Sequence, residues 1–98
     1  MRTVHVSTLP QAPLEAAAIF YRDYLPRCQD AAADLAIVLP PADHTHRAWR
    51  LAAVQELARA AAPLRVNAVS GEREAAIDEA LAYLATAPGL TGQVLVLA

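Results

Sequence analysis

Short runs of β-branched and other apolar residues alternate along this chain with longer stretches in which apolar positions recur every three or four residues. The runs span residues 3–7, 34–39, 64–69 and 92–97. Their composition predicts strands. The run at 34–39 does not alternate with polar residues, and a strand of that kind is usually buried on both faces of a parallel sheet.

The stretches between these runs have the periodicity of helices. The first helix is expected over Pro13–Cys28, because proline is tolerated in a first turn, where its missing N–H is not needed. Pro26 is expected to loosen the last turn, since it cannot donate a backbone hydrogen bond. The second helix is predicted from about 45 to 62, and the third begins after Ser70, whose hydroxyl is suited to cap it. The core stripe expected for the second helix consists of Leu51, Val54, Leu57, Ala58 and Ala61.

This alternation of strands and helices predicts the fold class. Strands joined by helices over short connections favour an α/β fold in the order βαβαβαβ, with a mainly parallel four-stranded sheet. Right-handed crossovers would place the strands in sequential order, 1-2-3-4. The 98 residues show no repeat or linker, so a single domain, 1–98, is expected.

Composition narrows the classes of partner. The net charge is −2, and the eight basic residues are all dispersed arginines, so no nucleic-acid partner is expected. No apolar run approaches the ~18 residues of a membrane span, and no membrane partner is expected. The single cysteine, Cys28, fits a reducing cytoplasm. The bias toward alanine and arginine is typical of a GC-rich bacterial gene.

Two segments carry a resemblance to a known family. Leu64–Ser70, with the sequence LRVNAVS, resembles the sixth-strand segment of short-chain dehydrogenases/reductases (SDRs). The stretch from Tyr83 to Val96 is similar to the final helix and strand of that family. The resemblance implies a truncated, Rossmann-like three-layer fragment that corresponds to the second half of the family's domain.

The resemblance also implies where the family's catalytic residues would lie. Its serine would fall at Pro40–Pro41, its tyrosine near Ala42 or Asp43, and its lysine near His46 or Arg47. Those residue types are missing there, and the chain contains no lysine. The chemistry needs a phenol whose pKa is lowered by an adjacent ammonium. We therefore assign no catalytic residue and expect no oxidoreductase activity.

A cofactor site is equally poorly supported. The family's glycine-rich turn, which cradles the pyrophosphate at a helix N-terminus, belongs to the first half of its domain. This chain has three glycines, and none of them lies in the turn directly after the first strand. Ser70 and Gly71 partly match the family's proline-glycine cofactor turn. They are the weak candidates for contact with NAD(P).

Two polar features have a chemical and a structural interpretation. The sequence Asp43-His44-Thr45-His46 can be a His-x-His metal site, or a polar loop in which Asp43 or Thr45 caps the second helix. Cys28 can be a reactive thiol or a small apolar core residue. In both cases the structural interpretation is preferred, and no metal ligand is assigned.

Trp49 is the candidate for an interface. On a helical wheel it lies roughly 160° from the centre of the expected core stripe, beside Ala53 and Ala60. A large aromatic residue flanked by alanines allows close approach by another helix. The SDR resemblance implies that the helices at 13–28 and 45–62 pair with those of a second subunit. We therefore predict a homodimer through these helices.

The function expected from the sequence is that of a truncated SDR-like protein without oxidoreductase activity. It would act as a dimeric scaffold or as an accessory subunit. A full-length dehydrogenase is a possible partner, bound along the strand edge at Val4–Ser7. The alternative is weak NAD(P) or small-molecule binding at a composite site between subunits, near Ser7, Pro40, Ser70 and Gly71.

Overall fold

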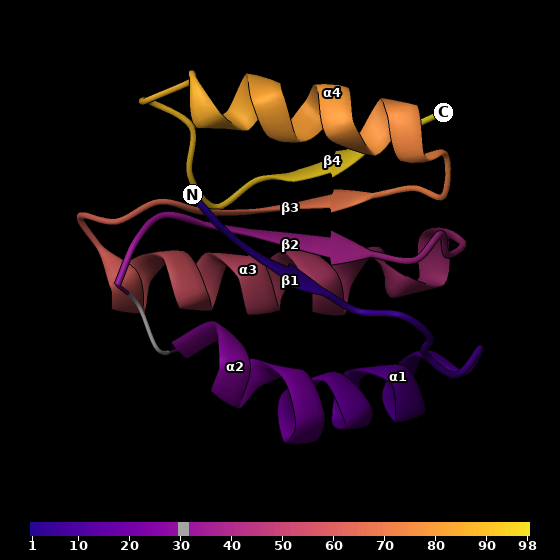
Figure 1. Cartoon of the computed structure of the whole chain (residues 1–98). Helices are drawn as coiled ribbons and strands as arrows, with labels where there is room; N and C mark the ends of the chain where they lie inside the picture. Colours follow the sequence, from indigo (N-terminus) through magenta and orange to yellow (C-terminus); the bar gives the residue numbers. More distant parts are fainter. Residues whose placement is uncertain (30–31) are drawn as a thin grey trace.

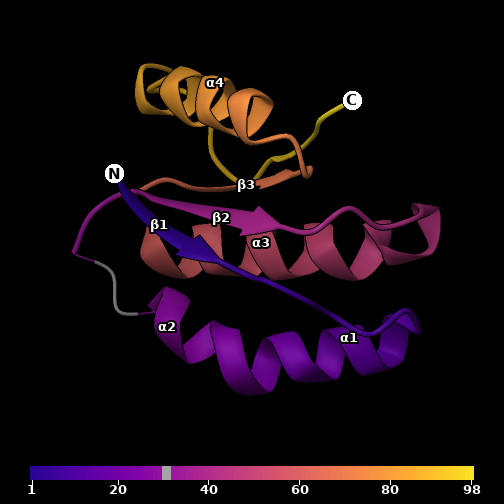
Figure 2. The same cartoon turned by 45° about the vertical axis from the view of Figure 1, so that its right-hand side comes forward.

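The computed structural model describes residues 1–29 and 32–98, which form a four-stranded sheet between two helical layers (Figure 1 and Figure 2). The strands are β1 (Arg2–His5), β2 (Leu35–Leu39), β3 (Val66–Ser70) and β4 (Val94–Val96). The helical segments are α1 (Pro13–Ile19), η1 (Phe20–Tyr24), α2 (Leu25–Gln29), η2 (His44–His46), α3 (Arg47–Ala61) and α4 (Glu74–Ala85). Every strand pair is parallel and the order is β1-β2-β3-β4, so the predicted fold class and strand order are confirmed.

The side chains of β2 show why the layers form. All five residues of this strand are buried, as its unalternating apolar sequence predicts. Leu35, Ile37 and Leu39 join the core beneath α1 and α3. Ala36 and Val38 point to the opposite face and join the core beneath α4. The strand therefore supplies both cores, and helices cover both faces of the sheet (Figure 1).

The first helix is continuous in the chain but changes its hydrogen-bond pattern in the middle. The segment η1 is π-helical, and the N–H of Leu25 donates to the carbonyl of Phe20, five residues earlier. This widened turn lies immediately before Pro26, which has no N–H to offer. The disturbance predicted near Pro26 is thus found as the π-helical segment η1, which ends two residues before this proline. Within the residues described, no helix is both long and apolar enough to cross a membrane.

The buried face of α3 is only partly the one expected. Val54, Leu57 and Ala58 are buried as predicted, but Leu51 is 36% exposed and Ala53 is 1% exposed. The reason is that α3 contacts both the sheet and the helical layer formed by α1 and α2. Its buried arc is therefore shifted toward that layer. The assignment of Leu51 to the core and of Ala53 to an outer face is wrong.

Asn67 connects β3 to the loop that precedes β4. It is 3% exposed, its Nδ2 donates to the carbonyl of Leu90 at 2.8 Å, and its Oδ1 accepts from the N–H of Gln93 at 3.1 Å. The same loop contains Gly92, whose φ of +73° favours glycine. One buried amide thus satisfies a donor and an acceptor of a loop that has no regular secondary structure.

Replacing Asn67 with aspartate is expected to reduce the free energy of unfolding by about 2–3 kcal/mol. The carboxylate has nearly the same shape, but it cannot donate to Leu90, and it would be a buried negative charge beside that carbonyl. Urea unfolding followed by circular dichroism measures the loss. The matched control is Gln93→Glu, which makes the same chemical change on an exposed side chain. Equal stability of the Asn67 variant and this control would contradict the role of Asn67.

Candidate functional site

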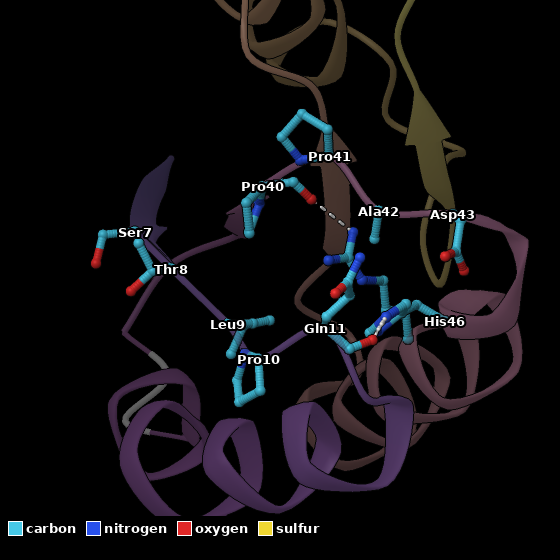
Figure 3. A pocket seen from close by; sticks show the side chains of 11 residues that line it. Ser7, Thr8, Leu9, Pro10, Gln11, Pro40, Pro41, Ala42, Asp43 and His46 are labelled. Atoms are coloured by element: carbon cyan, nitrogen blue, oxygen red, sulfur yellow. Dashed lines mark hydrogen bonds between the residues drawn. The ribbon is translucent and has the colours of Figure 1, made fainter.

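Two adjoining cavities open at the end of the sheet where the strands have their carboxyl ends. Their volumes are about 330 and 340 Å³. The first lies between the loops that follow β1 and β2 (Figure 3), and the second lies between the start of α3 and the ends of β3 and β4. Both are lined by Ala42, Asp43, His46 and Arg50. Ligands of parallel α/β sheets bind at this end, which makes it the candidate site.

His46 connects α3 to the loop after β1. The imidazole is 3% exposed, and its Nε2 lies 2.9 Å from the carbonyl oxygen of Gln11 (Figure 3). Because a carbonyl only accepts, Nε2 carries the proton. Its Nδ1 then accepts from the indole N–H of Trp49 at 3.1 Å. Both ring nitrogens are engaged, so this histidine has no lone pair left for a metal ion.

Asp43 caps the short helix η2, which immediately precedes α3. Its carboxylate accepts from the backbone N–H of Thr45 at 2.9 Å and from the Thr45 hydroxyl. These hydrogen bonds lower the pKa of the Asp43 carboxyl from its ordinary value. Residues 43–46 thus form a capped polar turn, but the prediction that Asp43 or Thr45 caps the second helix is wrong in detail, because the cap belongs to η2 and α3 begins without a side-chain cap. In the part of the chain that the structure describes, no three His, Cys, Asp or Glu side chains gather as metal ligands would.

Arg50 places a positive charge inside this end of the sheet. It is 5% exposed, and its Nη1 donates to the carbonyl of Pro40 at 2.9 Å and to the Ser70 hydroxyl at 3.0 Å. Its Nε is buried without a hydrogen-bond partner, and no carboxylate of the described residues forms an ion pair with it. Burial lowers the pKa of the Arg50 guanidinium, which nevertheless keeps its charge at neutral pH. The guanidinium also lies 5.6 Å from the ring centroid of Trp49.

Ser70 and Gly71 lie at this end of the sheet, but each has a structural task. Ser70 is 5% exposed in β3, where its hydroxyl accepts from Arg50 and donates to the carbonyl of Pro40 at 3.3 Å. It is not the predicted cap of the third helix, because Arg73 precedes α4 and no side chain caps it. A Cβ on Gly71 would come within 3.1 Å of Leu97, so glycine allows the C-terminal segment to pack closely.

The residues at the positions that the resemblance assigns to catalysis have structural roles or are exposed. The Pro40 carbonyl is bound by Arg50, Asp43 caps η2, and His46 is enclosed by its two partners. Arg47 is exposed on the rim of the second cavity. Among the described residues, no tyrosine lines either of these two cavities. The arrangement contains no phenol beside an ammonium.

The three interface candidates do not share one exposed face. Trp49 is half-buried, packs against the core, and has its ring centroid 5.6 Å from that of Phe20 in the same chain. Ala53 is buried, whereas Ala60 is exposed. The placement of Trp49 opposite the core is therefore wrong. Of the three, Ala60 alone is an exposed residue on α3.

Cys28 is part of the core. It is 3% exposed and carries a free thiol. Burial raises the pKa of this thiol, although the charges of Arg2 and Arg27 act in the opposite direction. The interpretation of Cys28 as a buried apolar residue is confirmed.

Arg50 is the site residue that the sequence patterns missed. It stands four residues before Val54 and seven before Leu57, both in the predicted core stripe. A charged residue at this spacing lies on the buried face of the helix. The sequence signal that could have identified Arg50 as a site residue is therefore its position within the apolar stripe of the second helix.

Comparison with known proteins gives one family match, which covers most of the chain. Comparisons with curated proteins and with solved structures give no match. A family described as short chain dehydrogenase-like protein, or SDR-like, matches residues 4–97. This match includes the second half of β1 and all of the other strands and helices described above. The chain belongs to the short chain dehydrogenase-like family.

Proposed function

We propose that this SDR-like protein performs no hydride transfer of its own and works as a homodimeric scaffold or as an accessory subunit. The observation that carries the proposal is the chemistry at the carboxyl end of the sheet, where Arg50 is hydrogen-bonded to Pro40 and Ser70 and no tyrosine of the described residues lines the two cavities. Proton transfer to a carbonyl requires an acid of suitable pKa. Hydrogen bonds from Thr45 lower the pKa of the Asp43 carboxyl, so Asp43 is held as a carboxylate and is not such an acid.

An activity assay tests the first half of this proposal. NADH and NADPH oxidation is followed at 340 nm, roughly the wavelength at which the reduced nicotinamide absorbs, with small aldehydes, ketones and quinones as acceptors. We expect no rate above that of buffer. Turnover that scales with protein concentration and survives repurification would contradict the absence of hydride transfer.

Self-association is proposed through the outer surfaces of the helices at 13–28 and 45–62. Ala52 and Ala60 are exposed on α3, and small side chains allow another helix to approach closely. Tyr21, which is 41% exposed, supplies apolar area on the neighbouring helical segment. The two copies would be related by a two-fold axis.

The double variant Ala52→Arg/Ala60→Arg is expected to convert the dimer to a monomer. Two bulky charges would be buried without partners at the proposed contact. Light scattering at micromolar concentration measures the mass. The control is Ala82→Arg, an equivalent change on an exposed position of α4, which should remain dimeric. A wild-type protein that is monomeric at that concentration would contradict the dimer proposal.

The accessory-subunit form of the proposal uses the edge of the sheet. Strand β1 is the first in the strand order, so one side of its backbone faces away from β2. Unpaired N–H and C=O groups on an edge strand are suited to pair with another sheet. A full-length dehydrogenase is the proposed partner of this edge.

Weak NAD(P) or small-molecule binding between subunits is the second candidate. A cavity of about 320 Å³ beside Ser70, Gly71 and Arg73 favours it. Glu72 and Glu74 oppose it, because they bring negative charge to the start of α4, where a pyrophosphate would lie. Titration with NADH and NADPH decides: a Kd below roughly 100 µM, equivalent to about −5.5 kcal/mol, would support this candidate.

A further inference from the structure

The hydrogen bonding of Arg50 is incomplete for a buried cation. A charged side chain removed from water is costly unless an opposite charge or a full set of acceptors replaces the lost hydration. Arg50 has two neutral acceptors, both at Nη1, and its Nε has none. Asp43 lines the same cavities, but its Oδ1 accepts both hydrogen bonds from Thr45, and among the described residues it forms no ion pair with Arg50.

The second cavity combines this charge with an apolar wall. Arg47 and Arg50 both line it, and Arg47 is exposed to solvent. Leu51, Val94 and Val96 form the apolar side, and Val96 is 77% exposed. An exposed apolar wall next to two guanidinium groups is suited to a ligand with one charged end.

We propose that the second cavity binds a small organic oxyanion, a carboxylate or a phosphate monoester on an apolar body. The charged head would pair with Arg50 and Arg47, and the body would lie against Leu51, Val94 and Val96. Guanidinium groups bind both kinds of head in a bidentate manner, which explains the preference for an oxyanion. The residues named for this site are those of a single chain, so the proposal does not rest on the proposed dimer or on nucleotide binding.

Trp49 provides the readout. It is the only tryptophan, and its ring lies 5.6 Å from the Arg50 guanidinium, so a ligand that draws on this group will change its fluorescence. The full chain is titrated with hexanoate, hexyl phosphate, hexan-1-ol and inorganic phosphate. We expect saturable binding of hexanoate, hexyl phosphate or both. Comparing these two ligands shows whether the site prefers a carboxylate or a phosphate head group. Binding of inorganic phosphate should be at least about 10-fold weaker, because it buries no methylene groups.

The variants locate the binding. Arg50→Gln is expected to weaken it by about 10- to 100-fold, the loss of a charge-assisted pair. Arg47→Glu, on an exposed residue, should weaken it by roughly 3-fold or more without affecting folding. Arg59→Gln is the control, because Arg59 pairs with Glu56 on the exposed side of the same helix and should leave the affinity unchanged.

Three results would overturn the proposal. The first is a lack of binding by both hexanoate and hexyl phosphate. The second is hexan-1-ol binding as tightly as either of them, since the oxyanion would then contribute nothing. The third is unchanged affinity in Arg50→Gln or, if that variant does not fold, in Arg47→Glu. Failure of the dimer test has no bearing on these outcomes, so the two proposals are separately refutable.

Discussion

Replacing Phe20 with alanine is expected to lower the free energy of unfolding by about 3–5 kcal/mol. The side chain is 1% exposed at the start of the π-helical segment. Its ring stacks on Tyr24 at a centroid distance of 6.2 Å and packs on Trp49 at 5.6 Å. Alanine would leave a cavity between the first helical layer and α3. Because a domain has only about 5–15 kcal/mol of stability, this loss is a large fraction of the total.

The same substitution should disturb the candidate site. Phe20 supports one side of Trp49, and Trp49 in turn donates to His46, which holds the loop at Gln11. Loss of this support frees the indole to move. We therefore expect a red shift and increased quenching of Trp49 fluorescence under native conditions, in addition to the lower stability.

Urea unfolding, followed by circular dichroism and by Trp49 fluorescence, measures both effects. Tyr83→Ala is the matched control, because it removes an aromatic ring that is 57% exposed on α4, and it should change stability by less than about 0.5 kcal/mol. Phe20→Leu keeps most of the volume and should cost less than about 1.5 kcal/mol. If Phe20→Ala lost no more stability than Tyr83→Ala, Phe20 would not be the centre of this core.

The strands were predictable because each is marked by the residue types of its own short segment of the chain. The unalternating sequence at 34–39 requires two covered faces, and helices on both faces supply them. Strand boundaries differ from the prediction by up to two residues. Pro26 likewise marks a disturbance in the first helix before any tertiary contact is known, although it does not specify a π-turn.

The faces of α3 were not predictable in this way. A helical wheel assumes one partner, whereas α3 packs on the sheet and on the first helical layer at once. On the side of that layer Ala53 is buried and Trp49 is half-buried, whereas Leu51 is left exposed beside the short strand β4. In the sequence Ser70 has the features of a helix cap, but in the structure its hydroxyl accepts a hydrogen bond from Arg50 of α3. These assignments depend on contacts between distant residues.

Replacing Arg65 with methionine is expected to cost about 2–4 kcal/mol, reduced where water still reaches the pair. The guanidinium forms an ion pair with Asp34 at 2.8 Å, and the two side chains are only 16% and 29% exposed. Its Nη1 also donates to the carbonyls of Leu84 and Ala87 at the end of α4. Methionine keeps much of the packing, and its backbone N–H still donates to Asp34 Oδ1. It leaves the two carbonyls and Asp34 Oδ2 without the side-chain donor they have in the wild type.

The Asp34 pair should make stability depend on pH in a defined direction. A hydrogen bond from the Arg65 backbone N–H, followed by the bonds and charge of its side chain, lowers the pKa of the Asp34 carboxyl below its ordinary 3.8. A lowered pKa in the folded state means that the stabilisation is present above the unfolded value and is lost as pH falls through the folded value. We expect Asp34→Asn to be less stable than wild type at pH 7, with the difference shrinking below about pH 4.

Urea unfolding at a series of pH values between about 7 and 2.5 measures this difference. Asp23 and Asp43 also have lowered pKa values, so both proteins keep some acid dependence and only the difference between them is diagnostic. Glu56→Gln, which removes an exposed carboxylate paired with Arg59, should show no comparable difference. A constant gap between wild type and Asp34→Asn at every pH would mean that its charge does not stabilise the fold. The expected result instead means that the charge of Arg65 is balanced by Asp34 of the same chain. Arg50 lies at the opposite end of β3, and its charge has no such carboxylate partner among the described residues.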